Sequence, residues 1–354
     1  MPAFDLTHFL RPERGHRRLL TQTSPGHYEL CIDNTTLEKM LTCPRSFELY
    51  AVLGRDSGER DALNYGSAIH AALEVYYKGG TLNEMIAVLC VAFTAKPCAP
   101  NSWRNFDHAL VAIEQYARWR DQMTMCPWVP LVLTDEEKRD DGTIQVNTRL
   151  AVEIPFKIEL FKVPDIVIRY PQSLVSDVAS TVDSFICQSI TVFWTGKIDL
   201  LVTGRDLAPA VLDHKTSSMG GPTFWGQFRL SSQMRGYCWA GSKILRQPVR
   251  TAIIDALMGR APTVKGKGIS HENETQEFVY SDEQITEWEK DVVIHIKHVL
   301  LNLSNGYFPQ ANTWCFNKYG ACPYFDVCAL SKRAGSQLLM SGQYAERTWN
   351  PLTA

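Results

Sequence analysis

The segment that most constrains the fold is TGKIDLLVTGRDLAPAVLDHKTS, which runs from residue 195 to residue 217. Its two apolar runs are rich in Val, Ile and Leu, and the short turn-rich RDLA between them predicts a β-hairpin. Side chains alternate along a strand, so Asp213 and Lys215 share one face, and the hairpin brings Asp199 close to Asp213. We therefore expect a sheet whose hairpin carries carboxylates within apolar strands.

These carboxylates predict a cation site. Two carboxylates on one face repel each other unless a cation lies between them, and Mg²⁺ or Mn²⁺ prefers such oxygen ligands. Lys215 beside them could orient or deprotonate a water, or neutralise charge on a phosphate. A salt-bridged D-x-K on a surface strand is the alternative. The apolar surroundings of Asp199 and Asp213 argue against it, because a buried ionised group needs a partner.

Two helical segments add candidates to the hairpin. His70 lies in a predicted helix over residues 60–78, after the small residues Gly66, Ser67 and Ala68, and is the candidate third metal ligand. A packed core histidine is the alternative. Gln233 and Tyr237 are four positions apart on a predicted helix and share a face, although this pair by itself indicates little.

The hydrophobic pattern divides the chain into a helical part and a sheet-forming part. Residues 1–33 are expected to be irregular, and a helix begins near Thr35, which has capping-box spacing to Glu38. Helices are also expected over residues 60–78, after Thr81, and over 103–123. Strands are expected in TIQVNTRLAVEIPFKI, in the hairpin and in VRTAIIDALMG, with helices after residue 225 and over 282–304. Residues 160–190 are ambiguous between core and insertion. The predicted regions are a basic segment at 1–33, a helical region at 34–126, a core at 127–305 and a cysteine-bearing segment at 306–354.

Three of the ten cysteines lie close together near the C-terminus. Cys315, Cys322 and Cys328 read C-x6-C-x5-C among Gly, Asn and Pro, which is typical of a metal-binding loop. Cys43, before Pro44, is the candidate fourth ligand, and such a site closes a loop of 315 − 43 = 272 positions. A [4Fe–4S] cluster and a zinc ion both accept four thiolates, and the lack of C-x2-C pairs favours iron–sulfur. Unligated thiols are the alternative.

The bulk composition excludes some classes of protein. No stretch reaches the ~18 apolar residues of a membrane span, and no signal-peptide pattern opens the chain, so we expect a cytoplasmic protein. The formal net charge is −2 over 354 residues, so any nucleic-acid site must be a local patch. Ten cysteines in an intracellular protein indicate thiols or metal ligands rather than disulfides.

Taken together, the motifs resemble a known family. CPR, G-x3-H, GKIDLL, LDHKTS, Q-x3-Y and the three late cysteines occur in this order over about residues 35–330. This order resembles the PD-(D/E)XK nuclease superfamily, and within it the RecB-like, Cas4-like branch of iron–sulfur exonucleases from phages and bacteria. The resemblance implies an α/β, restriction-endonuclease-like fold with a central mixed sheet flanked by helices. It also implies a helical N-terminal region and an Fe–S-bound C-terminal segment that packs back on residue 43.

The resemblance also implies roles for single residues. Lys215 would be the catalytic lysine, and Glu153 matches an acidic residue on the strand before the hairpin, with a structural or supporting role. The implied metal ligands are His70, Asp199, Asp213 and the carbonyl of His214. The motif that supports the active site and contacts DNA would be Gln233 and Tyr237. The implied cluster ligands are Cys43, Cys315, Cys322 and Cys328. The x6 gap after Cys315 departs from the x2 or x3 that is frequent in the family, so a loop insertion must be tolerated there.

The implied function is Mg²⁺- or Mn²⁺-dependent DNA hydrolysis, at ends or on single strands, in recombination, repair or phage DNA processing. DNA is the expected partner, together with a recombination or repair protein. Trp194 and Trp225 are candidate stacking residues, and Arg260, Lys265 and Lys267 are candidate phosphate contacts. Two alternatives remain open: a binding module that does not cut DNA, and a zinc-stabilised protein of unrelated function.

Overall fold

The computed structural model describes residues 19–56, 61–99, 102–122, 128–138, 144–169, 184–204, 206–218, 220–260, 270–317 and 320–346. The chain forms two compact units, each built from separate stretches of sequence. The first unit comprises Met1–Gly58, Pro155–Gly196 and Glu289–Ala354, and the second comprises Glu59–Ile154 and Lys197–Trp288. In the described part of the chain, no helix is both long enough and apolar enough to cross a membrane.

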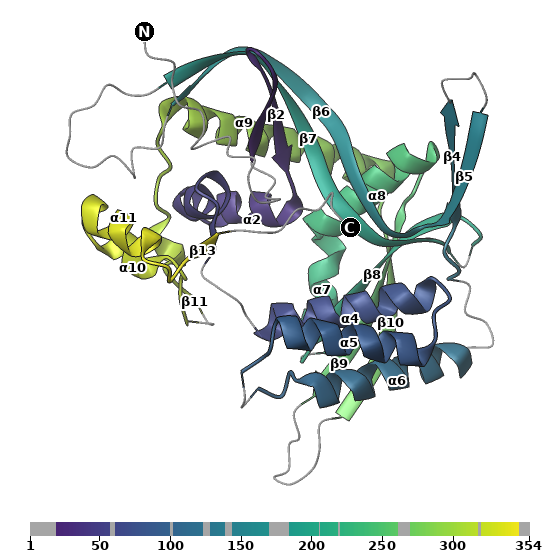
Figure 1. The fold of residues 1–354 in the computed structure, drawn as a ribbon. Coiled ribbons are helices and arrows are strands. Elements are labelled where there is room, and N and C mark those ends of the chain that lie inside the picture. The colour runs from purple at the N-terminus through teal and green to yellow at the C-terminus, as the bar shows by residue number, and fades with distance from the viewer. Residues whose placement is uncertain are drawn as a thin grey trace. The chain divides into compact units, whose positions relative to one another are not determined.

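The second unit contains a mixed sheet, as the sequence predicts. The end of β7 (Ser184–Thr203) pairs antiparallel with β8 (Pro209–Ser217), and β8 runs parallel to β9 (Thr251–Arg260). An antiparallel strand, β10 (Ser270–Val279), follows β9 in the strand order (Figure 1). β10 is not predicted from the sequence, because SHENETQEFV is mostly polar and lacks the apolar alternation of a half-buried strand.

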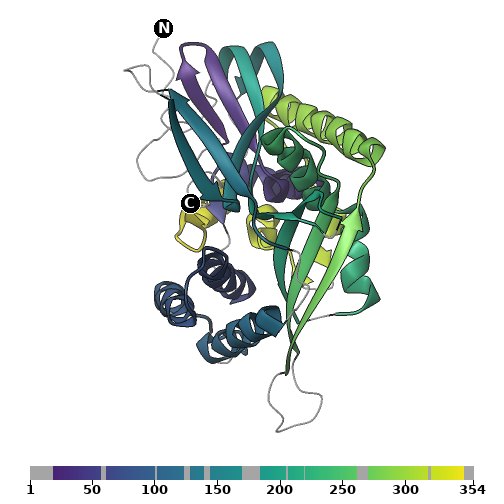
Figure 2. The same cartoon turned by 90° about the vertical axis from the view of Figure 1, so that its right-hand side faces the viewer.

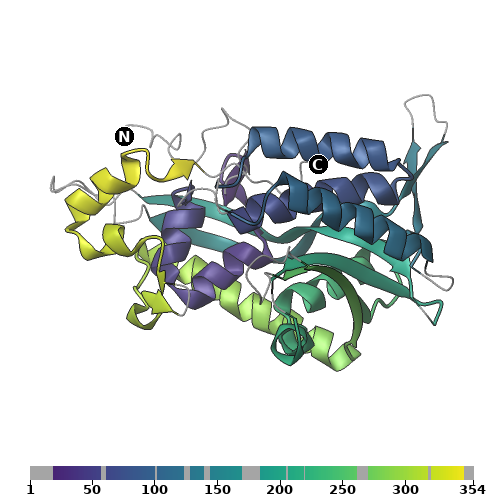
Figure 3. The same cartoon turned by 90° about the horizontal axis from the view of Figure 1, so that it is seen from below.

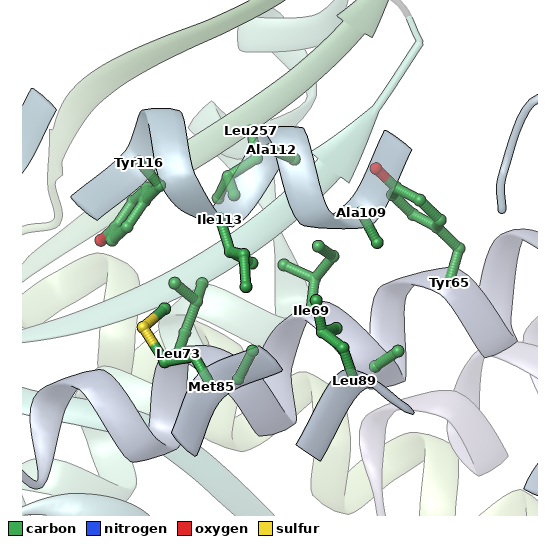
Figure 4. Close-up of a cluster of buried hydrophobic side chains, with 12 residues drawn as sticks. Tyr65, Ile69, Leu73, Met85, Leu89, Ala109, Ala112, Ile113, Tyr116 and Leu257 are labelled. Carbon is green, nitrogen blue, oxygen red and sulfur yellow. The ribbon is translucent and has the colours of Figure 1, made fainter. Parts of the chain in front are cut away.

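Three helices cover one face of this sheet: α4 (Asp61–Tyr77), α5 (Leu82–Ala95) and α6 (Phe106–Gln122) (Figure 2). Their apolar side chains form one cluster that also takes in Leu257 of β9, and its members include Ile69, Leu73, Leu89 and Ile113 (Figure 4). Each of these four side chains is at most 1% exposed. Burying an aliphatic side chain contributes roughly 1.5–3 kcal/mol, so this cluster fixes α4 on the sheet.

Helix α8 (Ser232–Leu245) covers the other face, where a Cβ at Gly241 would lie 3.2 Å from Leu201 and 3.4 Å from Val211. The parallel β8–β9 connection also contains α7 (Pro222–Gly226) and a short 3₁₀ turn at Gln227–Leu230. A second hairpin, of β4 (Val132–Lys138) and β5 (Ile144–Leu150), lies between α6 and β6 in the sequence. Because helices cover both faces of the sheet, the side chains of β8 alternate between the α8 face and the α4–α6 face.

Two predicted helix starts have different outcomes. The capping box of Thr81 and Glu84 is present at α5, with both reciprocal hydrogen bonds formed. The helix expected to begin near Thr35 is present as α2 (Asn34–Thr42), but its N-cap is Asp33 instead of Thr35. Oδ1 of Asp33 accepts a hydrogen bond from the N–H of Thr36 at 2.7 Å. Asp33 is as good an N-cap as Thr, and its carboxylate also suits the positive end of the helix.

In the first unit, residues 20–32 form two strands and a turn, where an irregular segment was expected. β1 (Leu20–Ser24) and β2 (His27–Ile32) form a hairpin around Gly26, which has a positive φ of 79°. β2 then runs parallel to the first half of β7, from Ser189 to Trp194. The pattern in HYELCI is only six residues long, too short to stand out against irregular surroundings. β6 (Val152–Arg169) also pairs with β7, so much of the ambiguous stretch 160–190 is strand.

The C-terminal elements of the first unit lie beside its N-terminal helices (Figure 3). β13 (Ala345–Glu346) pairs with β3 (Arg55–Asp56), and the hydroxyl of Tyr324 donates to the carbonyl of Arg55 at 2.7 Å. The remaining elements here are α3 (Pro44–Phe47), a π-helical turn at Glu48–Val52, the second half of α9 (Asp282–Asn305), a 3₁₀ turn at Asn312–Trp314, β11 (Phe316–Asn317), β12 (Gly320–Ala321), α10 (Phe325–Ala329) and α11 (Lys332–Met340). Two stretches far apart in sequence thus meet within one unit.

Candidate active site

The hairpin places Asp199 beside the start of the D-x-K segment. Leu200 of β7 pairs with Leu212 of β8, and just beyond this pair the N–H of His214 donates to Oδ2 of Asp199 at 2.8 Å. Asp199 and Asp213 are 7% and 2% exposed, so both carboxylates are buried where apolar strands bring them. The predicted proximity of these strands thus places two acidic groups close together on β7 and β8.

A group of three possible metal ligands includes Asp199. Ligand atoms of His70, Glu153 and Asp199 all lie within 4.8 Å of one another, and Nδ1 of His70 is 3.3 Å from Oδ2 of Asp199. Glu153, at the start of β6, also forms an ion pair with Lys197. From the sequence, Glu153 is expected to have only a structural or supporting role. Its place in VEIPF marks a strand, but nothing in that pattern indicates which residues it faces.

The charges in this site strongly influence one another. Burial alone would raise the pKa of Asp199, but His70 and His214 hold the pKa of that carboxyl well below its usual range. Burial would lower the pKa of His70, yet the adjacent Asp199 carboxylate raises it to about 9. Burial raises the pKa of Asp213, and Asp199 adds to this shift although Lys215 opposes it. The site is a buried set of acidic groups balanced by nearby cations.

Lys215 connects the hairpin to helix α8. Its Nζ lies 2.8 Å from Oδ2 of Asp213 and donates to Oε1 of Gln233 at 3.1 Å. Nε2 of Gln233 in turn donates to the hydroxyl of Tyr237 at 3.0 Å. The structure therefore brings together the four residues Asp213, Lys215, Gln233 and Tyr237, and the amide of Gln233 fixes where the ammonium group points.

A close helix–strand approach brings His70 to the hairpin. A Cβ at Gly66 would lie 3.3 Å from Oγ1 of Thr216, which is tighter than an ordinary contact. Since Gly66 precedes His70 by about one helical turn, the missing side chain lets α4 lie near β8 at this point. The small residue in G-x3-H therefore has a packing role next to the site.

The structure also brings the four predicted cluster cysteines together in the first unit. The N–H of Ala311 donates to Sγ of Cys43 at 3.4 Å, and the N–H of Cys322 donates to the carbonyl of Cys315 at 2.7 Å. Burial raises the pKa of Cys328 to about 11; Arg45 opposes this shift, while the thiols of Cys322, Cys43 and Cys315 add to it. All four thiols are thus close enough to interact electrostatically.

The predicted stacking and phosphate residues fare differently. Trp194 is 1% exposed, so the expectation that it stacks on bases is wrong: its side chain belongs to the core. Trp225 is half-buried, and its Nε1 donates to Glu274 at 3.2 Å. Lys265, Lys267 and the side chain of Arg260 lie outside the described residues.

Comparison with known proteins identifies the class to which this fold and site belong. The sequence matches the family model of the PD-(D/E)XK nuclease superfamily over residues 34–329. The chain belongs to this superfamily.

Solved structures and curated proteins add little to this assignment. A candidate exonuclease from Eubacterium rectale aligns with 79% of this chain and 84% of its own, at 11% identity and a TM-score of 0.41. The solved protein SSO0001 aligns with 73% of this chain and 84% of its own, at 12% identity and a TM-score of 0.23. No curated protein matches the sequence.

Proposed function

We propose that this protein is a Mg²⁺- or Mn²⁺-dependent deoxyribonuclease that hydrolyses phosphodiester bonds at DNA ends or on single strands. The observation that carries the proposal is the convergence of ligand atoms from His70, Glu153 and Asp199 within 4.8 Å. These groups fit a divalent cation, because buried carboxylates repel one another and an oxygen-rich donor set with one imidazole suits Mn²⁺ and Mg²⁺.

In this proposal each residue of the candidate active site has a defined task. The residues that would hold the cation are His70, Glu153, Asp199 and Asp213, with the carbonyl of His214. When bound, the cation would polarise the scissile phosphate and lower the pKa of a water. Lys215, held by Asp213 and Gln233, orients the attacking water or stabilises charge on the phosphate. The hydroxyl of Tyr237 accepts from Gln233 and supports it, and in this proposal Tyr237 also contacts the DNA strand.

A module that binds DNA without cutting it is the second candidate. Clustered carboxylates repel phosphate, so such a module has no use for Asp199 and Asp213 buried next to each other. Lys215 also forms its ion pair with Asp213 rather than facing outward as a simple phosphate contact. These two features favour hydrolysis over binding alone.

The test is digestion of end-labelled single- and double-stranded DNA with Mn²⁺, Mg²⁺ or EDTA, with blocked ends to separate exonuclease from endonuclease action. We expect Lys215→Ala and Asp213→Asn to lower the rate by at least about a hundredfold, which corresponds to loss of a transition-state interaction. Lys162→Ala, which removes an exposed lysine of β6, is the matched control and should cut normally. Metal-dependent cleavage that survives either active-site change would refute the assignment.

We further propose that Cys43, Cys315, Cys322 and Cys328 hold a [4Fe–4S] cluster, which would place the chain in the iron–sulfur branch of the superfamily. Cys315, Cys322 and Cys328 lack the C-x2-C pairs that are usual in structural zinc sites, which favours a multi-iron cluster. Burial raises the pKa of Cys322 and Cys328, and the cations of Lys39 and Arg45 oppose these shifts, which suits an anionic group.

Anaerobically purified protein tests the cluster directly. We expect broad visible absorbance with about four iron and four sulfide per chain, lost in Cys322→Ser and retained in Cys90→Ser. Cys90 is an exposed thiol on α5 and serves as the matched control. A colourless protein that contains stoichiometric zinc and no iron would contradict the cluster.

A further inference from the structure

A second polar network lies behind the site, on the α4–α6 face of the sheet. His214 and Asp255 are paired in the β8–β9 register, and Asp255 and Thr275 are paired in the β9–β10 register. Paired residues on neighbouring strands point to the same face, so these three side chains form a row across the sheet. Asp255 is fully buried at 0% exposure in an otherwise apolar strand.

Asp255 is hydrogen-bonded through both of its oxygens. Oδ2 accepts from Nη2 of Arg120 at 2.7 Å and from the hydroxyl of Tyr116 at 2.6 Å, and both donors come from α6. Oδ1 accepts from the hydroxyl of Thr275 at 2.7 Å. Nε of Arg120 also donates to the hydroxyl oxygen of Tyr116 at 3.1 Å, so Arg120, Tyr116 and Asp255 are each hydrogen-bonded to the other two. The hydroxyl of Tyr116 lies at the edge of the apolar cluster rather than within it (Figure 4).

The network reaches the site through His214. Nε2 of His214 lies 3.3 Å from the hydroxyl of Tyr116 and 3.8 Å from Oδ2 of Asp255. Its Nδ1 lies 3.5 Å from Oδ2 of Asp199, the same oxygen that accepts the His214 N–H. The imidazole therefore lies between the carboxylates of Asp199 and Asp255.

Aromatic packing restricts the orientation of this imidazole. The ring centroids of Tyr77 and Tyr116 lie 5.4 Å and 6.0 Å from that of His214, and the hydroxyls of the two tyrosines are 2.6 Å apart. His214 is 3% exposed, so it has no room to adopt another rotamer without moving these rings. An imidazole fixed in this way fixes the carboxylate that it contacts.

We propose that Tyr116, Arg120 and Asp255 are positioning residues that hold His214, and through it the carboxylate of Asp199, in the geometry that binds the divalent cation. The inference rests on the proposed function. A buried ion pair is often no more stabilising than apolar residues of the same size, so stability alone does not account for Arg120 and Asp255. Outer groups that orient the ligands of a metal are known to change its affinity.

Two hydroxyl deletions separate a positioning role from a structural one. Tyr116→Phe and Thr275→Val each remove one hydrogen bond to Asp255, but only the hydroxyl of Tyr116 also contacts His214. The affinity for Mn²⁺, measured by calorimetry or electron paramagnetic resonance, should fall by about 10–100-fold in Tyr116→Phe and remain within about twofold in Thr275→Val. Thermal unfolding in EDTA shows the stability lost in each variant, and Tyr77→Phe controls for the bond between the two tyrosines.

A double-mutant cycle completes the test. In a His214→Ala background, Tyr116→Phe should no longer change the affinity for Mn²⁺, because the residue through which it acts is absent. Equal losses of affinity in Tyr116→Phe and Thr275→Val, or an undiminished Tyr116→Phe effect without His214, would overturn the inference. If the unsubstituted protein binds no Mn²⁺ at all, the proposed function fails instead, so the two failures are distinguishable.

Discussion

At the scale of single residues, the least relaxed position in the site is Glu153. Its backbone has a φ of +51°, in the left-handed region that a residue with a Cβ rarely adopts, and such conformations cost about 1–3 kcal/mol. Burial raises the pKa of its carboxyl, and the nearby Asp199 adds to that shift, although Lys197 opposes it. Strain and a buried charge occur together here, beside His70 and Asp199, which is typical of residues kept for function rather than stability.

Glu153→Gln should therefore separate function from stability. The amide keeps the size of the side chain but removes repulsion with Asp199, so the free energy of unfolding in EDTA should stay equal or rise. The affinity for Mn²⁺ should fall at least about tenfold, because one carboxylate oxygen ligand is weakened. Chemical denaturation in EDTA and calorimetric titration measure the two quantities. A variant that loses stability while retaining its affinity for Mn²⁺ would contradict the role of Glu153 as a ligand.

Because of His271 on β10, we expect the stability of the protein to depend on pH in a way that is independent of metal. Burial lowers its pKa, and His108, whose ring centroid is 5.8 Å away, lowers it further. As pH falls through the ordinary value of 6.5, the unfolded chain takes up a proton before the folded protein does, so stability falls. His271→Gln should flatten this acid-side loss between pH 7 and the lowered pKa. His298→Gln, at an exposed position of α9, is the control, and an unchanged slope in His271→Gln would contradict the prediction.

Residue patterns in the sequence reveal only part of this site. Asp213 and Lys215 could be placed on one face because their spacing is local and follows from the alternation of a strand. The ligand position of Glu153 and the network around Asp255 depend on register between strands and on how α4 and α6 lie over the sheet. That information is tertiary, and no local pattern around Tyr116 or Arg120 contains it.

At the scale of elements, the distance between α4 and β8 sets the position of His70. Gly66 is the point of closest approach, since a Cβ there would lie 3.3 Å from Oγ1 of Thr216. Alanine normally favours a helix over glycine by about 1 kcal/mol, so retaining glycine at Gly66 has a stability cost that close packing offsets. A helix displaced by a few tenths of an ångström at Gly66 would carry His70 with it.

Gly66→Ala should weaken Mn²⁺ binding, and Thr216→Ala in the same chain should restore it. The added Cβ pushes α4 from β8, whereas removal of Oγ1 from Thr216 makes room for it. Gly226→Ala is the matched control because a Cβ there meets nothing within 4 Å. Mn²⁺ titration of the two single variants and the double variant measures the effect. Binding that stays weak in the double variant would show that contact with Thr216 is not the cause.

Helices and strands with strong hydrophobic periodicity are predicted correctly from the sequence. The hairpin strands, α4 and α9 follow from apolar patterns longer than a single turn or strand pair. β10 and the β1–β2 hairpin are not predicted from the sequence, because their segments are polar or short. Pairing with neighbouring strands holds these segments in place, and that pairing leaves no pattern in their own sequence. β2, for example, is aligned by its parallel pairing with residues Ser189 to Trp194 of β7.

At the scale of the whole molecule, the two proposed metal sites belong to different units. His70, Glu153, Asp199 and Asp213 lie in the second unit, and the four cysteines lie in the first. The proposed cluster would join Cys43 to a segment that begins 272 positions later, and closing so long a loop would restrict the unfolded chain strongly. The cluster is therefore expected to stabilise the first unit, and the divalent cation to order the second.

Hydrogen exchange measured by mass spectrometry can test whether the cluster stabilises the first unit and the divalent cation orders the second. Loss of the cluster in Cys322→Ser should speed exchange in α2, α10 and the β3–β13 pair, because these elements hold or adjoin the thiols. The hairpin of β7 and β8 should keep its protection, as it should in the Cys90→Ser control. Removing Mn²⁺ with EDTA should give the reverse pattern, with faster exchange around His70 and Asp199 alone. Uniform loss of protection in both experiments would mean that the two sites stabilise one cooperative structure instead.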